Sequence, residues 1–493
     1  MAANCLLIIR MSLRLSRLTP NTKTEQMWKV HRKDHYRKAD LMTMDPRILE
    51  QRDSIVDRWR TICRFASTAD NLPEIHRAAR WLESQLQPLF SEVGTIPVEG
   101  YGPVVYGIER GRSAKTLMLY NHYDVQHAGD EKQWIHPPYE AQIHDGVLYA
   151  RGACDDKADV AGRLDSFRLW KQEHGGVLPY TVIYFADPCE EIGSPGLENV
   201  LRDHAELFRS DACLWESYLR EEDGSPSIGF GCRGSLSVRI SVRALKDGIH
   251  PSYGTVVRSA PLEVMKIVAG LTTDDGLVAV KGMRDLAIKA SPEALRRVRR
   301  IGVPSESLRL NESTDPNPQA DMDELRRRFI FEPGMSLAAY DLDSSSVRSI
   351  PPECSARVRF SLVPGMDPKQ CLALIRAHVA QRNPDAVVEM IDSIEPAYSS
   401  PDSCFGQSIT EAAQSAYGKP PVIYDIMTGA GPGAMFLKYL GAPIASPTGT
   451  LRPDGNMHGY NEHGAVEDFL THANFTLTLL RELESHGFGR GDQ

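Results

Sequence analysis

The sequence predicts an α/β fold in which an α+β domain interrupts the chain of a larger domain. Three observations support this prediction. Helix-like and strand-like segments alternate in the first part of the chain, strands of period two appear after Cys232, and the α/β alternation resumes at about residue 405. A chain of 493 residues is also long enough to form two domains.

The first part of the chain begins with a helical pattern and continues with apolar strands. Apolar residues recur at spacings of three and four from Pro46 to about Leu89, as on one face of a helix. Strand-like runs follow at residues 103–109, 116–125, 147–152 and 180–187. Segment 157–176 has the pattern of a helix that ends at two glycines. Strands that alternate with helices favour an α/β sheet.

The later part of the chain contains two kinds of sequence pattern. Residues 235–244 and 355–364 alternate polar and apolar side chains, and the region 270–330 between them is charged and helix-prone. Helix- and strand-like segments then resume at residues 408–418, 421–427 and 433–441 and in a closing helix. We therefore expect a discontinuous domain of residues 46–232 and 402–493, an inserted domain of residues 233–401 and a disordered N-terminal extension of residues 1–45.

Composition excludes several classes of protein. The net charge of −9 argues against nucleic-acid binding, and no stretch is long and apolar enough to span a membrane. The nine cysteines are scattered without a CxxC pair, which predicts a reducing, cytoplasmic location. The N-terminal apolar patch is broken by Arg10 and Arg14, so it does not fit a secretory signal, although a weak targeting segment stays an alternative to a tail.

Polar side chains follow apolar strands at several places. His122 and Asp124 end one strand and share one side of it, because side chains alternate along a strand. Asp155 and Asp156 follow a second strand and a glycine turn. Two adjacent carboxylates repel each other unless a cation lies between them. Each pair, taken alone, also fits a hydrogen-bonded or solvated side chain.

Three further segments carry the same residue types. Glu190 and Glu191 end another apolar strand, and Glu216 lies among apolar residues, where an unpaired carboxylate would be costly. The glycine-rich "DGNMHGYNEH" carries His458 and His463. A set of nitrogen and oxygen ligands without cysteine suits zinc, manganese or cobalt. The surplus of acids leaves one carboxylate free to act as a base, as in two-metal hydrolases.

As a set, these segments resemble the M20 family of metallopeptidases, which includes carnosinase, carboxypeptidase G and acetylornithine deacetylase. The matching pieces are "NHYDVQ", "ARGACDDKAD", "CEEIGSPGLE", "GCRG", "IPPECSARVRFSLVPGMDP" and "DGNMHGYNE", in the family's order from about residue 105 to 465. The resemblance implies a phosphorylase/hydrolase-like α/β catalytic domain that binds metal, with an inserted α+β lid or dimerisation domain. The long insertion is most similar to the carnosinase-like branch.

The resemblance also implies two divalent metal ions per subunit, zinc above all, with manganese or cobalt as alternatives. His122, Asp155 and Glu216 would hold one ion. Asp155, Glu191 and His458 would hold the other, so that Asp155 bridges the two ions.

The same resemblance implies roles beyond metal binding. Glu190 would be the general base and then the general acid, and Asp124 would orient His122. His250 would reach the active site of a partner subunit, which implies a homodimer formed through the inserted domain.

Two departures from the family concern the substrate. Ser361 stands where this branch usually has an arginine, and a carboxylate is best held by a bidentate arginine. Arg233, Arg359 or Arg452 could substitute for it. Gly429 and Ala430 replace the usual Gly-Ser or Gly-Thr pair, so we expect residues Arg233, Gly429, Ala430 and Gly431 to contact the substrate.

The sequence therefore predicts a hydrolase that cleaves the C–N bond of a small amide or peptide. A dipeptidase or N-acyl amino acid deacylase, each with a substrate that carries a carboxylate, is one alternative, and a non-catalytic metal-binding scaffold is another. Other motifs are weaker. "GAGPGA" at 429–434 has a proline within it and lacks the acid expected of a dinucleotide site, and no histidine is singled out to activate Cys154 or Cys189 as a nucleophile. His463 is expected to be a surface histidine or one that lies behind the metal ligands.

Overall fold

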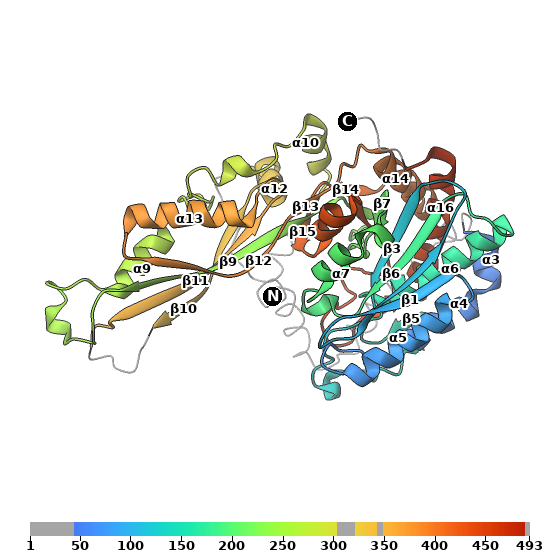
Figure 1. Cartoon of the computed structure of the whole chain (residues 1–493), viewed down its shortest axis with the longest axis horizontal. Coiled ribbons are helices and arrows are strands. Elements are labelled where there is room, and N and C mark those ends of the chain that lie inside the picture. Colours follow the sequence, from blue (N-terminus) through green and yellow to red (C-terminus); the bar gives the residue numbers. More distant parts are fainter. Residues whose placement is uncertain (1–43, 303–320, 343–348, 489–493) are drawn as a thin grey trace, which may run out of the picture. The chain divides into compact units, whose positions relative to one another are not determined.

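The structure is a computed structural model that describes residues 44–302, 321–342 and 349–488 (Figure 1). Apart from its last two residues, the predicted N-terminal extension lies outside the described residues. The chain divides into two compact units. Unit 1 contains the described parts of Met1–Phe230, Ser399–Ile423 and Met435–Gln493, and unit 2 contains those of Gly231–Tyr398 and Tyr424–Ala434.

The division into units shifts the predicted boundaries of the insertion by two residues at its start and three at its end, and it differs at one further segment. Residues 424–434, which we expected in the larger domain, belong to unit 2. The reason is that a strand within this segment, β15 (Met427–Ala430), pairs in parallel with β9 (Gly231–Arg243) of unit 2.

Unit 1 is built on a mixed sheet. Among the described residues, eight strands form it in the order β1-β2-β6-β3-β7-β16-β8-β14. Their bounds are β1 Glu92–Pro97, β2 Pro103–Glu109, β3 Thr116–His122, β6 Thr181–Asp187, β7 Ala212–Leu214, β8 Ser227–Gly229, β14 Val422–Tyr424 and β16 Ile444–Pro447. Strand β3 is parallel to β6 and β7, and β7 is parallel to β16. The carboxyl ends of these four strands therefore lie at one edge, where open α/β sheets bind ligands.

Helices cover this sheet and complete the core of unit 1. They are α3 Pro46–Glu50, α4 Arg52–Cys63, α5 Leu72–Leu86, α6 Lys157–His174, α7 Leu197–Asp203, α8 Ala205–Phe208, α14 Cys404–Tyr417 and α16 Val466–His486, with a π-helical turn at Phe436–Leu440. The short helix α15 (Gly433–Met435) begins in unit 2 and ends at the first residue of the last segment of unit 1. Helix α6 packs against α4, α16 and β3, and α14 packs against α16. The strand residues Leu117–Tyr120 are buried, as the apolar run of a central strand requires.

Two boundaries in unit 1 follow from glycines. Helix α6 ends where Gly175 adopts a φ of 60°, a left-handed conformation that stops a helix. The strand expected at 147–152 ends early, as β5 (Val147–Tyr149), because the chain turns at Gly152, whose φ is 84°. Strand β5 belongs to a small sheet with β4 (Gln142–His144) and β17 (His463–Ala465).

Unit 2 is an α+β structure. In its described residues, β10 (Gly334–Leu342), β11 (Glu353–Leu362), β9 and β12 (Val387–Ile394) pair in that order, and β13 (Ala397–Tyr398) and β15 pair with β9. Helices α9 (Ala260–Ala269) and α13 (Pro368–Arg382) pack on this sheet, and α10 (Pro292–Val298) packs on α12 (Met322–Phe331). The α/β class with an inserted α+β part is thus confirmed.

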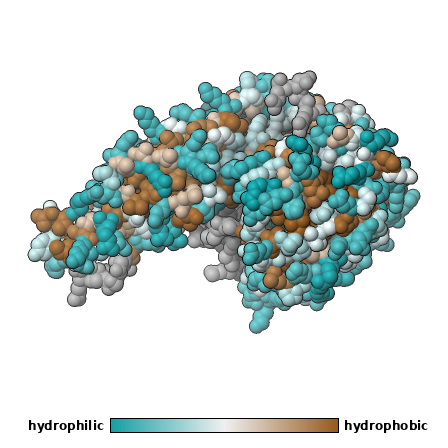
Figure 2. Space-filling view, in the orientation of Figure 1, coloured by the Kyte–Doolittle hydropathy of each residue, from teal (hydrophilic) through white to brown (hydrophobic). Residues whose placement is uncertain are grey.

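The surface of unit 2 exposes several large apolar side chains, and Figure 2 shows hydrophobic residues among hydrophilic ones over this unit. They include Tyr253, Val256, Leu262, Met265, Leu337, Met390 and Ile391. Strands β10 and β12, which carry the last three, are the two outer strands of the four-strand path. Across the described ranges, no helix is both long and apolar enough to cross a membrane.

Candidate metal centre

The parallel strands of unit 1 bring the predicted ligands together at their carboxyl ends. In the register of β3 and β6, His122 lies opposite Asp187, and Leu119 lies opposite Leu214 of β7. Glu216 follows β7 by two residues, and the 3₁₀ turn Glu190–Ile192 follows β6. Segments distant in sequence are thus neighbours because the strand order β6-β3-β7 places their ends side by side.

Two groups of side chains have the spacing of metal ligands. The first is His122, Glu190 and Glu216, and the second is Asp155, Glu191 and His458; within each group the ligand atoms lie within 4.8 Å of one another. We call these six residues the ligand cluster. Two imidazoles and four carboxylates form a donor set that suits zinc, manganese or cobalt.

Asp155 connects the two groups. Its Oδ2 atom is 2.9 Å from Nε2 of His458, and its Oδ1 atom is 3.1 Å from Nε2 of His122. Nε2 of His458 is also 2.9 Å from Oε2 of Glu191, and Nε2 of His122 is 3.7 Å from Oε2 of Glu216. The grouping differs from the implied ligand set, because Glu190 takes the place of Asp155 in the first group.

Asp124 lies behind the ligand cluster. Its carboxylate is 3.2 Å from Nδ1 of His122 and accepts the backbone N–H groups of Glu190 and Glu191, each at 3.1 Å. When the Nδ1–H group of His122 donates this hydrogen bond, the lone pair of the ring lies on Nε2, the atom that faces the ligand cluster.

The ligand cluster concentrates like charges in a buried place. Burial and the neighbouring Asp155 raise the pKa of Glu216 to about 7. The pKa values of Glu190 and Glu191 are also raised by burial, and then by the nearest acids, Glu216 and Asp155 respectively. Burial would raise the pKa of Asp155 too, but hydrogen bonds with His122 and His458 lower it overall. Crowded carboxylates of this kind favour a bound cation.

Asp187 was not singled out by the sequence pattern, although it ends β6. The buried carboxylate accepts hydrogen bonds from Ser194 Oγ at 2.7 Å, Tyr120 Oη at 3.2 Å and the Cys189 N–H at 3.1 Å. It therefore holds the turn that carries Glu190. Burial and the nearby Asp124 raise its pKa to about 6. Its position directly before the "PCEE" segment was the signal that could have identified it.

The residues expected to bind substrate lie in unit 2. The Arg233 side chain is buried; its Nη2 donates to the carbonyl of Phe329 at 2.6 Å, and its Nη1 donates to the Glu332 carbonyl and to Ser361 Oγ at 3.1 Å each. Burial lowers its pKa to about 10. The hydroxyl at the position of the usual lid arginine therefore accepts a bond from Arg233.

The other unit 2 candidates are placed by the backbone. Gly429 and Ala430 lie in β15, with Ala430 paired to Arg233 of β9, and there is open space where a Cβ at Gly429 or Gly431 would be. His250 is exposed, and its Nδ1 accepts the N–H of Ser252 at 3.2 Å.

Other motifs weighed in the sequence do not form a second site. Burial raises the pKa of the Cys154 thiol well above its ordinary value and also raises that of Cys189, so neither is poised as a thiolate nucleophile. The Nδ1 atom of His463 is 2.9 Å from the Asn461 carbonyl. His136 and His144 stack on each other with ring centroids 3.8 Å apart.

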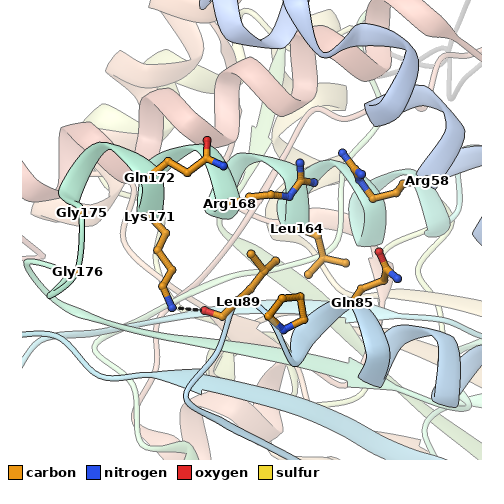
Figure 3. A pocket seen from close by; sticks show the side chains of 10 residues that line it. Arg58, Gln85, Leu89, Leu164, Arg168, Lys171, Gln172, Gly175 and Gly176 are labelled. Atoms are coloured by element: carbon orange, nitrogen blue, oxygen red, sulfur yellow. Dashed lines mark hydrogen bonds between the residues drawn. The ribbon is translucent and has the colours of Figure 1, made fainter.

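A pocket of about 450 Å³ lies along α6, lined by basic and apolar side chains (Figure 3). Its cations have partners in the fold. Arg58 and Arg168 both pair with the buried carboxylate of Asp165, and Lys171 donates to the Leu89 carbonyl and to Glu109. None of the ligand cluster lines this pocket.

Several curated relatives of the chain are named as dipeptidases. It is 26% identical over 292 residues to the Cys-Gly metallodipeptidase dug1 of Schizosaccharomyces pombe, covering 57% of this chain and 60% of the relative. It is 27% identical over 209 residues to the cysteinylglycine-S-conjugate dipeptidase of Corynebacterium striatum, covering 42% of this chain and 46% of the relative. The match to the human Beta-Ala-His dipeptidase is 22% identical and covers 68% and 65%. The chain thus spans under two thirds of the length of these relatives.

Solved structures share the fold over nearly the whole chain. The M20 family metallo-carboxypeptidase Sso-CP2 from Sulfolobus solfataricus superimposes with a TM-score of 0.76 and 23% identity, covering 87% of this chain and 99% of that one. The dipeptidase Dug1p from Saccharomyces cerevisiae superimposes with a TM-score of 0.70 and 18% identity, covering 92% and 99%. Residues 118–482, well over half of the chain, match the family model described as peptidase family M20/M25/M40, and the chain therefore belongs to this family.

Proposed function

We propose that this protein is a dinuclear-metal-dependent hydrolase that cleaves the C–N bond of small amide or peptide substrates. The observation that supports this most directly is the joining of two ligand groups through Asp155, with Glu190 beside them. His122, Asp155 and Glu216 would hold one divalent ion, and Asp155, Glu191 and His458 the other. Bound divalent ions of this kind polarise a scissile carbonyl and lower the pKa of water.

Three residues of the chain would perform the other steps of the reaction. Glu190 accepts a proton from the attacking water and then delivers it to the leaving nitrogen, and its raised pKa suits a carboxyl that both takes and returns a proton. Asp124 fixes the tautomer of His122. His250 helps to stabilise the oxyanion in a partner subunit, as the family resemblance implies.

The substrate class is set by whether a carboxylate is recognised. The names of the relatives favour a dipeptide. Ser361 and the three hydrogen bonds of Arg233 within unit 2 instead favour a substrate without a carboxylate. We propose a small amide as the substrate, with a dipeptide or N-acyl amino acid as the alternative.

A homodimer through the inserted domain is part of this proposal. The exposed apolar side chains on β10 and β12 support it, because solvent-exposed apolar residues on outer strands are typical of surfaces that another chain covers. Light scattering on the purified protein should give twice the mass of one chain, and a monomer at micromolar concentration would contradict it.

One experiment tests the function. The chain is stripped with chelator, its bound metal is counted after addition of zinc, manganese or cobalt, and hydrolysis is measured with Cys-Gly, β-Ala-His, N-acetyl amino acids and the C-terminal amides of the same dipeptides. We expect two ions per chain, and faster hydrolysis of the amides than of the free acids. Glu190→Gln should keep both ions and lose turnover.

The outcomes separate the alternatives. Faster hydrolysis of the free dipeptides than of their amides would establish the dipeptidase hypothesis. Metal binding without hydrolysis of any substrate would favour the non-catalytic scaffold. Fewer than two ions per chain, or full activity in Glu190→Gln, would refute the proposal.

A further inference from the structure

A buried ion pair links the two chain segments that carry Asp155 and His458. Nη1 of Arg151 is 2.6 Å from Oε2 of Glu462, and the two side chains are 2% and 1% exposed. Arg151 precedes Asp155 on the turn after β5, and Glu462 follows His458 on the loop before β17. Neither residue belongs to the ligand cluster.

The Glu462 carboxylate organises the turn that presents Asp155. Oε2 accepts the N–H of Gly152 at 3.1 Å, and Oε1 accepts the N–H groups of Cys154 at 3.0 Å and Asp155 at 3.3 Å. The Cys154 thiol also lies 3.3 Å from Oε1. A carboxylate that accepts several backbone N–H groups holds them in one arrangement, because a buried donor left without a partner is costly.

Arg151 connects the turn of Asp155 to the loop that contains His458. Its Nη2 donates to the carbonyls of Gly459 at 3.0 Å and His127 at 3.2 Å. Gly459 directly follows His458. The Arg151 guanidinium also lies 5.4 Å from the centre of the Trp134 ring, which packs it in place.

The loop of His458 needs such support. Asn456, His458 and Asn461 adopt φ values of 54°, 59° and 60°. Non-glycine residues rarely adopt this left-handed region and keep it only where surrounding contacts hold them. The direction of the His458 imidazole depends on this backbone.

We propose that Glu462 is a positioning residue that holds Asp155 and His458 at ligand distance. It does so through its ion pair with Arg151 and through the three N–H groups that it accepts. Glu462 thereby sets the affinity of the metal ion that the second ligand group would hold. The inference rests on the proposed dinuclear function. Asp155 and His458 lie on different chain segments, and the bonds of Glu462 and Arg151 join these segments from outside the ligand cluster. Groups behind the ligands commonly change metal affinity by about 10- to 100-fold when they are replaced.

The test compares Glu462→Gln with a matched control, Asp165→Asn. Asp165 is also a fully buried carboxylate with arginine partners, Arg58 and Arg168, but it lies in α6 away from the ligand cluster. Apo forms of the full chain are titrated with Co²⁺ and Zn²⁺ by calorimetry and by cobalt absorption, and their thermal unfolding is measured. Both variants should unfold at lower temperature than the wild type.

We expect only Glu462→Gln to bind one of the two ions more weakly, by about 10- to 100-fold, while the affinity for the other ion changes less. Unchanged affinities in Glu462→Gln would overturn the proposal. So would an equal loss at both ions, or a similar loss in Asp165→Asn, because these would report a general effect of destabilisation.

A second variant tests the proposal in case Glu462→Gln does not fold. Glu462→Asp keeps the charge but is too short to reach both segments, and it should show a smaller loss at the same ion; wild-type affinities in this variant would overturn the proposal. The wild type serves as the reference for the function itself. If it binds fewer than two ions, the dinuclear proposal fails, whereas two ions in the wild type with unaltered variants contradict the role of Glu462 alone.

Discussion

The ligand cluster of unit 1 and the surroundings of Arg233 in unit 2 both bury charge, but they balance it differently. In the ligand cluster, acids face acids, and the pKa of Glu216 is raised to about 7 by burial and by Asp155. In unit 2, the Arg233 guanidinium donates to three oxygens of its own unit. A charge satisfied within the fold contributes to stability, whereas charges left in conflict indicate a place for a ligand.

The difference teaches how to interpret a buried charged residue. Both places were marked in the sequence as functional, but only the ligand cluster brings its marked residues within ligand distance of one another. Arg233 is surrounded by backbone carbonyls and the Ser361 hydroxyl, which is the environment of a structural arginine. Three predictions test this contrast.

The largest effect is expected from a pair of histidines, one from each unit. His458→Ala should lose one metal ion and reduce turnover at least about 1,000-fold, equivalent to about 4 kcal/mol, because a ligand is removed. His250→Ala should keep both ions and reduce kcat by about 100-fold, as for the loss of one oxyanion donor. Metal content and kcat are measured on the same preparations. Loss of metal in His250→Ala would contradict the division of roles.

A smaller effect is expected for stability in unit 2. Arg233→Met should lower the free energy of unfolding by about 2–4 kcal/mol, since it leaves the carbonyls of Phe329 and Glu332 and the Ser361 hydroxyl without this donor. Arg239→Met, at an exposed position of the same strand, is the control and should change stability by less than about 0.5 kcal/mol. Urea unfolding measures both. Equal stabilities of the two variants would show that the three bonds contribute little.

The smallest effect has the opposite sign and belongs to the ligand cluster. Glu216→Gln should make the metal-free protein more stable than the wild type at pH 8, by roughly 2–3 kcal/mol, because the pKa of Glu216 is raised from its ordinary 4.5 to about 7 in the folded state. The protonated carboxyl stabilises the fold below about pH 4.5, and this contribution is lost as pH rises through about 7. The gain should therefore disappear at pH 4.

Unfolding in urea with chelator present, at pH 4 and pH 8, measures this gain. Glu206→Gln, an exposed acid on α8, is the control and should show no comparable gain. If Glu216→Gln were instead less stable than the wild type at pH 8, the carboxylates would not be in conflict in the metal-free protein.

Much of the fold and of the ligand cluster could be predicted because local pattern carries the information. The run at 116–125 was recognised by its apolar residues, and the structure ends β3 at His122, where the chain leaves the sheet. Acids and histidines at the ends of apolar strands can be recognised as candidate metal ligands from their residue type and position alone. The role of Glu462 could not be predicted, because it acts through hydrogen bonds to backbone groups about 300 positions away in sequence, such as the N–H of Gly152 at a separation of 310. Asp187 differs, since it holds a nearby turn through Ser194 and its place before "PCEE" was a local signal.

The sequence by itself determined the α/β class, the interruption by an α+β segment and the residues that end the strands, because periodicity and residue type are local properties. Only the tertiary structure decided that Arg233 is held by contacts within unit 2, that Glu462 bonds to the turn of Asp155 and that β15, within segment 424–434, pairs with β9. These outcomes depend on the order of parallel strands and on left-handed turns, which set distances between residues hundreds of positions apart.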